Sequence, residues 1–207
     1  MEWSDQGVEG AFRFLSRVWR IVGQFADTVR NAPDTYDVKA LTKEEKELRR
    51  ILHVTIKKVT EDIRDRFMFN TAISSIMELV NAFYVFQDKP ETNAGLLREV
   101  TLNLIKILAP FAPHITEELW SAIAGSGSVH QQPWPVYDAA AMVQDEVEIV
   151  LQINGKVRGK LVIDAGLDRK AMEQAALEHP RVRELVAGKE IAKVIAVPRK
   201  LVNIVVK

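Results

Sequence analysis

The chain has 207 residues, 47% of them hydrophobic and 27% charged, an ordinary composition for a globular protein. It has no cysteine, which excludes disulfides, thiolate nucleophiles and cysteine-ligated zinc and favours a cytoplasmic setting, and no apolar run approaches the ~20 residues that cross a membrane. The formal net charge is zero, but residues 146–207 carry 12 basic and 8 acidic side chains, so the end of the chain is its basic part.

Apolar residues at three- and four-residue spacing predict a long first helix from Val8 to Asn31. Its expected apolar face consists of Val8, Phe12, Leu15, Trp19, Val22 and Ala26. A second helix opens at Thr42, and Thr42 with Glu45 forms a capping box in the sequence.

The next segments continue the helical pattern. Asn70 is the expected N-cap of a third helix, which ends before Lys89-Pro90. Two further helices are expected over 94–109 and 114–124. The fold class is therefore predicted as mainly α, with an antiparallel α-helical bundle in the first part of the chain.

Composition and periodicity change after this bundle. Gly, Ser and Pro residues predict a bundle domain over 1–135, a linker over 136–145 and a second domain over 146–207. In the second domain, apolar residues alternate as in a strand, and Asn154-Gly155 is a hairpin signal. A helical stretch, broken at Pro180, precedes two short strands. The expected second domain is a small α+β domain of ββαββ order.

The hairpin admits two registers. A two-residue loop would pair Leu151 with Arg158, whereas a three-residue loop pairs Leu151 with Gly159 and Ile153 with Val157. Because a slip by one residue turns every side chain to the other face, we expect the register that keeps the apolar residues together. Arg158 and Lys160 then lie on the solvent face.

No catalytic or metal-binding motif is present. The chain has neither a phosphate-binding glycine loop nor a dinucleotide fingerprint, and its histidines do not pair at ligand spacing. We therefore predict no catalytic residue, no metal site and no cofactor in this chain.

Basic residues recur along the predicted helices and the hairpin. The first helix carries Arg13, Arg17 and Arg20. The second helix carries Lys46, Arg50, His53, Lys57 and Arg64 on the side opposite its predicted core face. The second domain carries Lys156, Arg158 and Lys160 on the hairpin and Lys200 in a later turn. Such stripes fit contacts with a nucleic-acid backbone, and they equally fit solvated faces.

Several motifs resemble the region that follows the catalytic domain of bacterial leucyl-tRNA synthetases. Matching segments are residues 3–19, 48–63, 69–73, 109–120, 133–135, 153–160 and 197–206. The bundle motifs, such as Phe69-Asn70-Thr71-Ala72-Ile73, are also similar to those of related class I synthetases. The tail, with Asn154-Gly155-Lys156-Val157-Arg158-Gly159-Lys160, is similar to the leucyl type alone.

The resemblance implies a bundle of anticodon-binding type that packs along the anticodon stem and D-arm, and a C-terminal domain at the tRNA elbow. The expected partners are tRNA(Leu) and a catalytic domain in cis, which would use ATP with magnesium to attach leucine. This chain alone is expected to be an inactive, monomeric fragment. The expected tRNA-binding residues are Arg13, Arg17, Arg20, Arg50, Lys57, Lys156, Arg158, Lys160 and Lys200. The alternative is a free-standing RNA-binding or protein-interaction module.

Overall fold

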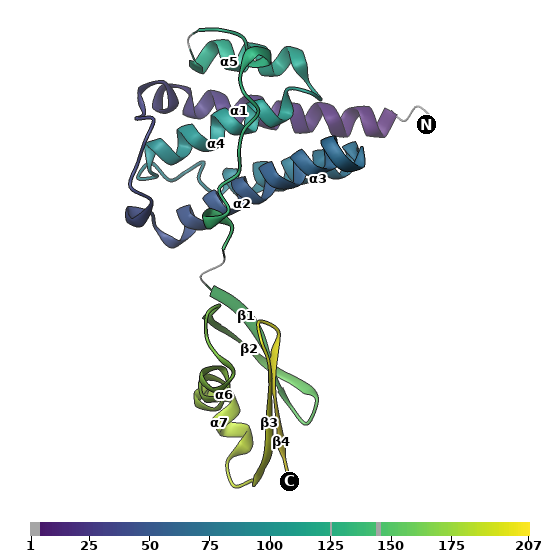
Figure 1. Cartoon of the computed structure of the whole chain (residues 1–207), viewed down its shortest axis with the longest axis vertical. Helices are drawn as coiled ribbons and strands as arrows, with labels where there is room; N and C mark the ends of the chain where they lie inside the picture. Colours follow the sequence, from purple (N-terminus) through teal and green to yellow (C-terminus); the bar gives the residue numbers. More distant parts are fainter. Residues whose placement is uncertain (1–4, 125, 144–145) are drawn as a thin grey trace. The chain divides into compact units, whose positions relative to one another are not determined.

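The computed structural model describes residues 5–124, 126–143 and 146–207 (Figure 1). The chain divides into two compact units, residues 1–143 and residues 144–207, which we call the helical unit and the tail unit. Within the described ranges, no helix is both long enough and apolar enough to cross a membrane. The fold is a helical bundle followed by a small α+β domain, as the sequence predicts.

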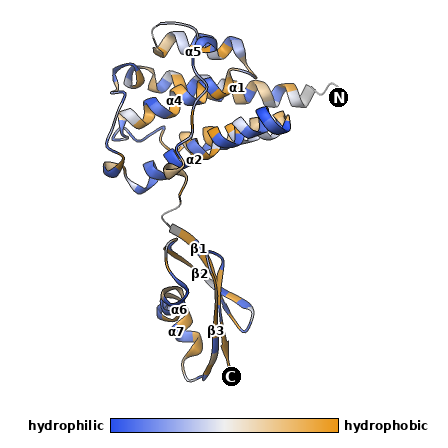
Figure 2. Ribbon diagram, in the orientation of Figure 1, coloured by the Kyte–Doolittle hydropathy of each residue, from blue (hydrophilic) through white to orange (hydrophobic). Residues whose placement is uncertain are grey.

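The helical unit is built around one central helix. Its helices are α1 (Asp5–Asn31), α2 (Lys43–Glu61), α3 (Phe69–Tyr84), α4 (Ala94–Leu108) and α5 (Pro113–Ala124). Helix α4 packs against each of the other helices, and its apolar residues lie at the centre of the core. The helices alternate between hydrophobic and hydrophilic residues along their surfaces, as amphipathic helices do (Figure 2).

Helix α1 buries a face that is rotated from the one predicted: Val22 is buried in both, and Leu15 and Ala26 pack at the edge of the core. Val8, Phe12 and Trp19 are 48%, 70% and 49% exposed. The buried face consists of Phe14, Val18, Ile21, Val22, Phe25 and Val29. Since successive residues turn by about 100°, the helix carries two apolar stripes roughly a quarter turn apart. Periodicity alone cannot say which of the two faces the core.

The start of α2 matches its sequence signals, and the start of α3 does not. Thr42 Oγ1 accepts the amide of Glu45, and the Glu45 carboxylate accepts the amide of Thr42, so the capping box is confirmed. Asn70 is not an N-cap, because α3 already begins at Phe69 with Met68 as its cap. A π-helical turn over Asp62–Arg66 and a left-handed Phe67 at φ 51° bring the chain into α3. The Met68 carbonyl then accepts the first helical amides, so Asn70 lies inside the helix.

We call residues 132–143 the strap, because from Trp134 to Met142 its side chains and turn contact α2. The Trp134 indole donates to Thr60 Oγ1 over 2.8 Å, and the 3₁₀ turn Ala140–Met142 packs on the same helix. Residues 136–143, expected in a linker, therefore belong to the helical unit. The Gly, Ser and Pro residues that predict a linker mark changes of chain direction, whereas the side chains between and after them pack against α2. Residues 144–145 of the expected linker lie outside the described residues.

The tail unit is one sheet with helices on one face. Its elements are β1 (Glu146–Ile153), β2 (Lys156–Asp164), α6 (Arg169–Glu178), α7 (Pro180–Val186), β3 (Ile191–Val197) and β4 (Leu201–Val206). The strand order is β2-β1-β4-β3, with β1 and β4 parallel at the centre. Ile149, Leu151, Val202 and Ile204 are fully buried between the sheet and the helices. The predicted break at Pro180 is confirmed, because α6 ends before it and α7 begins there.

The hairpin combines features of both registers considered. Leu151 pairs with Gly159, as predicted, but Ile153 pairs with Lys156 and Gln152 with Val157. Asn154 and Gly155 have φ angles of 49° and 76°, which suits a two-residue turn. A bulge opposite Gln152 then shifts the register by one residue. The tight turn and the apolar core are thus both satisfied, and the predicted pairing of Ile153 with Val157 is wrong.

Candidate nucleic-acid interface

The tail unit presents cations that no other described group neutralises. Lys156, Arg158 and Lys200 are exposed and make no hydrogen bond or ion pair with their side chains among the described residues. Lys160 differs, because its ammonium lies 2.7 Å from Glu148 Oε1 on the neighbouring strand. Unpaired cations are the groups best suited to bind phosphate, since no local partner must first be displaced. Arg158 and Lys200 are therefore stronger candidates than Lys160.

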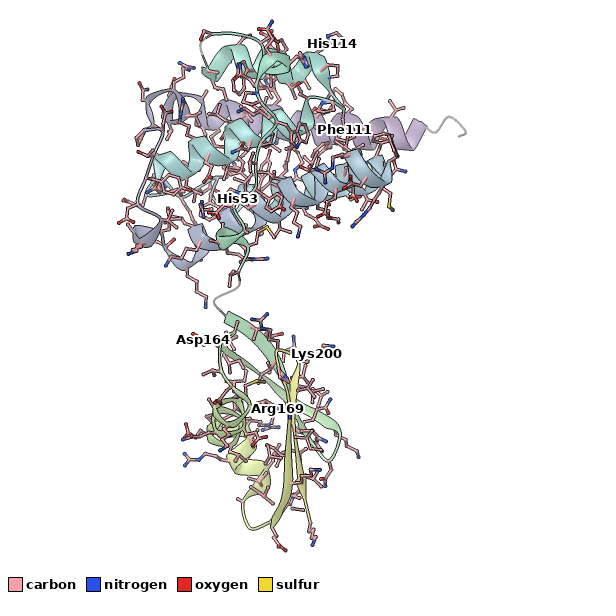
Figure 3. All side chains as sticks on the ribbon, viewed as in Figure 1. His53, Phe111, His114, Asp164, Arg169 and Lys200 are labelled. Atoms are coloured by element: carbon pink, nitrogen blue, oxygen red, sulfur yellow. The ribbon has the colours of Figure 1, made fainter. Side chains whose placement is uncertain are left out.

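The predicted tail residues do not form a single cluster. Asn154, at the hairpin tip, exchanges side-chain hydrogen bonds with the backbone of Val206 at the end of β4. Lys200 precedes the opposite end of β4, where Figure 3 shows it beside the strand ends. Lys156 pairs with Ile153, which lies beside Ile204, so Lys156 and Lys200 are about four residues apart along the strands and two strand spacings apart across the sheet, or ~16 Å. Lys160 and Lys200 are closer neighbours, since both flank Val150 on β1.

One face of the tail sheet is not covered by α6 and α7. Strand pairing places Lys160 and Gln152 on this face, together with Lys193 on the edge strand β3. Exposed aliphatic residues surround them on the same face, among them Val157, Val162, Ile195 and Val197. Lys193 was not predicted as a site residue because its face depends on the β3–β4 register. This open face joins basic and apolar groups that lie far apart in the sequence.

The three arginines of α1 lie outside the core but differ in their surroundings. Arg13 is exposed and lies 4.0 Å from Glu9. The Arg17 guanidinium lies 4.6 Å from the centre of the Tyr84 ring, and the Tyr84 hydroxyl donates to the Arg17 carbonyl. Arg20 is exposed and has no partner among the described residues. Arg20 is thus the α1 arginine most available to an anion.

The predicted α2 stripe is not a continuous exposed face. His53 is only 4% exposed because the strap covers it, so its place on a solvent face is wrong (Figure 3). Arg50 makes two short hydrogen bonds to Glu47, at 2.6 and 2.7 Å. Lys57 lies 4.0 Å from Glu61 and 5.7 Å from the Tyr137 ring centre. Much of the positive charge on α2 is therefore balanced within the helical unit.

A polar cluster links α2, α4 and the strap, and we call it the α2 clamp: Tyr36, Arg49, His53, Glu99 and Asp138. The Tyr36 hydroxyl donates to Glu99, and Arg49 Nε donates to the Tyr36 oxygen over 3.1 Å. Arg49 Nη2 donates to Asp138 Oδ2 over 3.0 Å. The amide of Asp138 donates to His53 Nδ1 over 3.1 Å, which assigns the ring proton to Nε2, 3.2 Å from Glu99 Oε1.

The charges of the α2 clamp favour its ionised carboxylates. Burial opposes ionisation of Glu99, but the adjacent His53 ring and a hydrogen bond from the Tyr36 hydroxyl outweigh it and hold the pKa of Glu99 below its usual value. The hydrogen bond from Arg49 lowers the pKa of Asp138. Burial, and then the Glu99 carboxylate, raise the pKa of Tyr36, so its phenol keeps the proton it donates. No local sequence signal marks this cluster, because Arg49 and Asp138 lie 89 positions apart.

The described residues contain no group of three or more His, Cys, Asp or Glu side chains placed to hold a metal ion. The clusters above are pairs of opposite charge or hydrogen-bonded networks. The exposed cations described above can bind anionic groups.

The chain is an α-helical bundle followed by a small basic α+β unit, and its exposed cations suit an anionic partner. The sequence profile of a family described as the anticodon-binding domain of tRNA ligase matches residues 45–173. The matched residues make up more than half of the chain, which therefore belongs to this family. The match begins in α2, spans the rest of the helical unit and continues into the tail unit.

A solved structure extends the likeness to the whole chain. In the crystal structure of the ternary complex of Agrobacterium radiobacter K84 agnB2 LeuRS, tRNA and LeuAMS, the LeuRS chain is 30% identical to this one, with a TM-score of 0.82. The alignment covers 100% of this chain and 27% of that chain. The chain thus spans about a quarter of the length of the synthetase that it matches.

Proposed function

We propose that this chain is the tRNA-binding C-terminal portion of a leucyl-tRNA synthetase and that its partner is tRNA(Leu). The observation that carries this proposal is the likeness, over the entire chain, to a LeuRS whose structure was solved with tRNA. The family match supports the helical unit as the anticodon-binding-type bundle. The tail unit, with its net positive charge, supports a second contact region on the same tRNA.

The two units have different parts in this proposal. The tail unit contacts phosphate and sugar at the tRNA elbow through Lys156, Arg158, Lys160 and Lys200. The helical unit lies along the stem and contributes Arg13, Arg17, Arg20, Arg50 and Lys57. Cations at these positions fix the register of the RNA without selecting its sequence, because phosphates are the same at every nucleotide. Base identity would then contribute little to affinity at these contacts.

The chemistry belongs to the parent enzyme in this proposal. A catalytic domain in cis uses ATP and magnesium to activate leucine and transfers it to the tRNA held by this chain. The chain itself contributes binding and orientation, which lower the entropic barrier to the transfer step. We further propose that the protein acts as a monomer in the cytoplasm, a reducing compartment that suits a chain without cysteine.

Charge variants of the tail unit test the proposal. The affinity of the full chain for tRNA(Leu) is measured over a salt series for wild type and for Arg158→Ala/Lys200→Ala. We expect the double variant to bind more weakly, with the log–log salt slope flatter by roughly 0.7–0.9 for each phosphate that it no longer neutralises. Thermal melts should be nearly unchanged, since exposed substitutions usually alter stability by no more than about 0.5 kcal/mol.

The matched control is Arg181→Ala. Arg181 is an exposed cation of the same unit, but it is paired with Glu184 on α7 at 3.4 Å. We expect this control to keep the salt slope of the wild type. Equal slopes for all three proteins, or equal losses of affinity in both variants, would contradict the assignment of Arg158 and Lys200 as phosphate-binding residues.

A further inference from the structure

The strap contacts α2 along one line of side chains. Along the strap, Trp134 contacts Thr60, Tyr137 contacts Lys57, and the amide of Asp138 contacts His53. The numbers rise along the strap and fall along α2, so the strap runs antiparallel to the helix. The spacing of these α2 residues keeps them on one helical face. The strap therefore has a defined register on α2.

On the α2 side of this contact, Arg49 is held in place by groups that do not belong to the strap. Arg49 Nε lies 3.1 Å from the Tyr36 oxygen and 3.5 Å from Glu99 Oε2, and its side chain is only 14% exposed. These bonds leave Nη2 directed at Asp138. A guanidinium held in place by two groups loses little freedom when it binds a third.

Asp138 is recognised through two of its groups. Its carboxylate accepts from Arg49, and its main-chain amide donates to His53 Nδ1. A second carboxylate oxygen accepts the amide of Ala140, which begins the turn that packs on α2. Removal of the Asp138 side chain would therefore weaken both the ion pair and the turn that follows it.

We propose that the α2 clamp is a positioning device, which holds the strap and so limits the length of free chain between the helical unit and the tail unit. Arg49, His53 and Asp138 are its positioning residues. The proposal rests on the proposed function, in which both units bind the same tRNA. Buried polar groups of the bundle then affect RNA binding although they do not contact the RNA.

The size of the effect follows from chain length. About 8 residues lead from Asp138 to the start of β1, and only about 4 lead there from Met142, where the packed turn ends, which span at most ~28 and ~14 Å. A strap released back to Gln132 leaves about 14 residues and ~50 Å. The effective concentration of a tethered group falls with tether length as roughly the 3/2 power or more steeply. Release of the strap should therefore weaken tRNA binding by about two- to six-fold.

The experiment uses the full chain and three variants. Asp138→Ala and Arg49→Met disrupt the clamp from its two sides. The control is Arg98→Met, which removes another partly buried arginine of the same unit, one that binds Asp34 and the Val29 carbonyl rather than the strap. Hydrogen exchange of residues 132–143 reports whether the strap is bound, and a salt series with tRNA(Leu) reports affinity and slope.

We expect both clamp variants to exchange the strap amides at least about ten-fold faster than wild type and Arg98→Met. Their tRNA affinity should fall two- to six-fold with an unchanged salt slope, because all the phosphate-binding cations are retained. Equal strap exchange in all four proteins, or a released strap with unchanged or higher affinity, would overturn the inference and leave the proposed function standing. A wild-type chain with a protected strap but no affinity for tRNA would overturn the proposed function itself, and this inference with it.

Discussion

Two helical glycines with opposite surroundings make a sharp test of the structure. A Cβ on Gly95, in the first turn of α4, would lie 2.8 Å from Tyr36 Cδ1 and 2.9 Å from Tyr36 Cβ. Tyr36 cannot easily move away, because its hydroxyl bonds to Glu99 and Arg49 and its Cβ is fixed to the backbone. A Cβ on Gly23, on the exposed side of α1, would meet nothing within 4 Å.

We expect Gly95→Ala to destabilise the chain by about 1–3 kcal/mol through overpacking. The gain in helix propensity, at most about 1 kcal/mol in a helix interior, is smaller in a first turn and does not offset this cost. The control Gly23→Ala should stabilise the chain by about 0.5–1 kcal/mol, since it has the propensity gain without the clash.

Urea unfolding followed by far-ultraviolet circular dichroism measures both changes in the free energy of unfolding. The two variants should move the midpoint in opposite directions at a similar m-value. If both variants stabilise the protein, Tyr36 is not packed against α4 as described. The hydrogen bonds that organise the α2 clamp would then need a different geometry.

Further predictions concern the tail unit, a helix cap, pH and catalysis. Ile149→Ala should lower the free energy of unfolding of the tail unit by about 2–5 kcal/mol, because Ile149 is fully buried in that unit's own core. In calorimetry only the tail unit's transition temperature should fall, and a shift of both transitions would argue against two separate cores. Asn93→Ala should lower the free energy of unfolding in urea by about 0.5–2 kcal/mol, because the Asn93 side chain caps α4 through the amide of Leu96. Asn70→Ala should lower it less, and a larger loss for Asn70→Ala than for Asn93→Ala would restore Asn70 as a cap. The pKa of Asp138 is lowered from 3.8, so its contribution to stability is complete above pH 3.8 and is lost as the pH falls through the lower folded value. The stability difference between wild type and Asp138→Ala should therefore be constant from pH 5 to 7 and shrink below pH 3.8. A difference that grows below pH 3.8 would be inconsistent with the Arg49 pair. Leucine-dependent ATP–pyrophosphate exchange by the pure chain should stay at background, and measurable exchange would refute the assignment of catalysis to another domain.

Local signals in the sequence predict local structure well. The capping box at Thr42, the break at Pro180 and the tail strands depend on residues that are close in sequence, and each is present in the structure. The hairpin shows where such signals compete. Its turn residues and its apolar pattern demand registers that differ by one residue, and a bulge, which neither signal predicts, satisfies both.

Features that depend on tertiary contacts could not be predicted in this way. The core face of α1 is chosen by α4 and α5, not by its own periodicity, which fits two stripes. His53 was assigned to a solvent face because the strap that covers it comes much later in the chain. The candidate cations could be identified by residue type, but their availability depends on partners such as Glu47 and Glu148, which only the folded chain brings to them.

The most direct test of the account is the affinity of the purified chain for a tRNA(Leu) transcript, compared with an RNA duplex of equal length that lacks the elbow. Both affinities are measured by fluorescence anisotropy at the same series of salt concentrations, because phosphate binding depends strongly on salt. We predict tighter binding to the tRNA at every salt concentration, since two linked units can engage both its stem and its elbow. Equal affinity for the two RNAs, or no binding to either at low salt, would contradict the claim that this chain is a tRNA-binding portion of a synthetase.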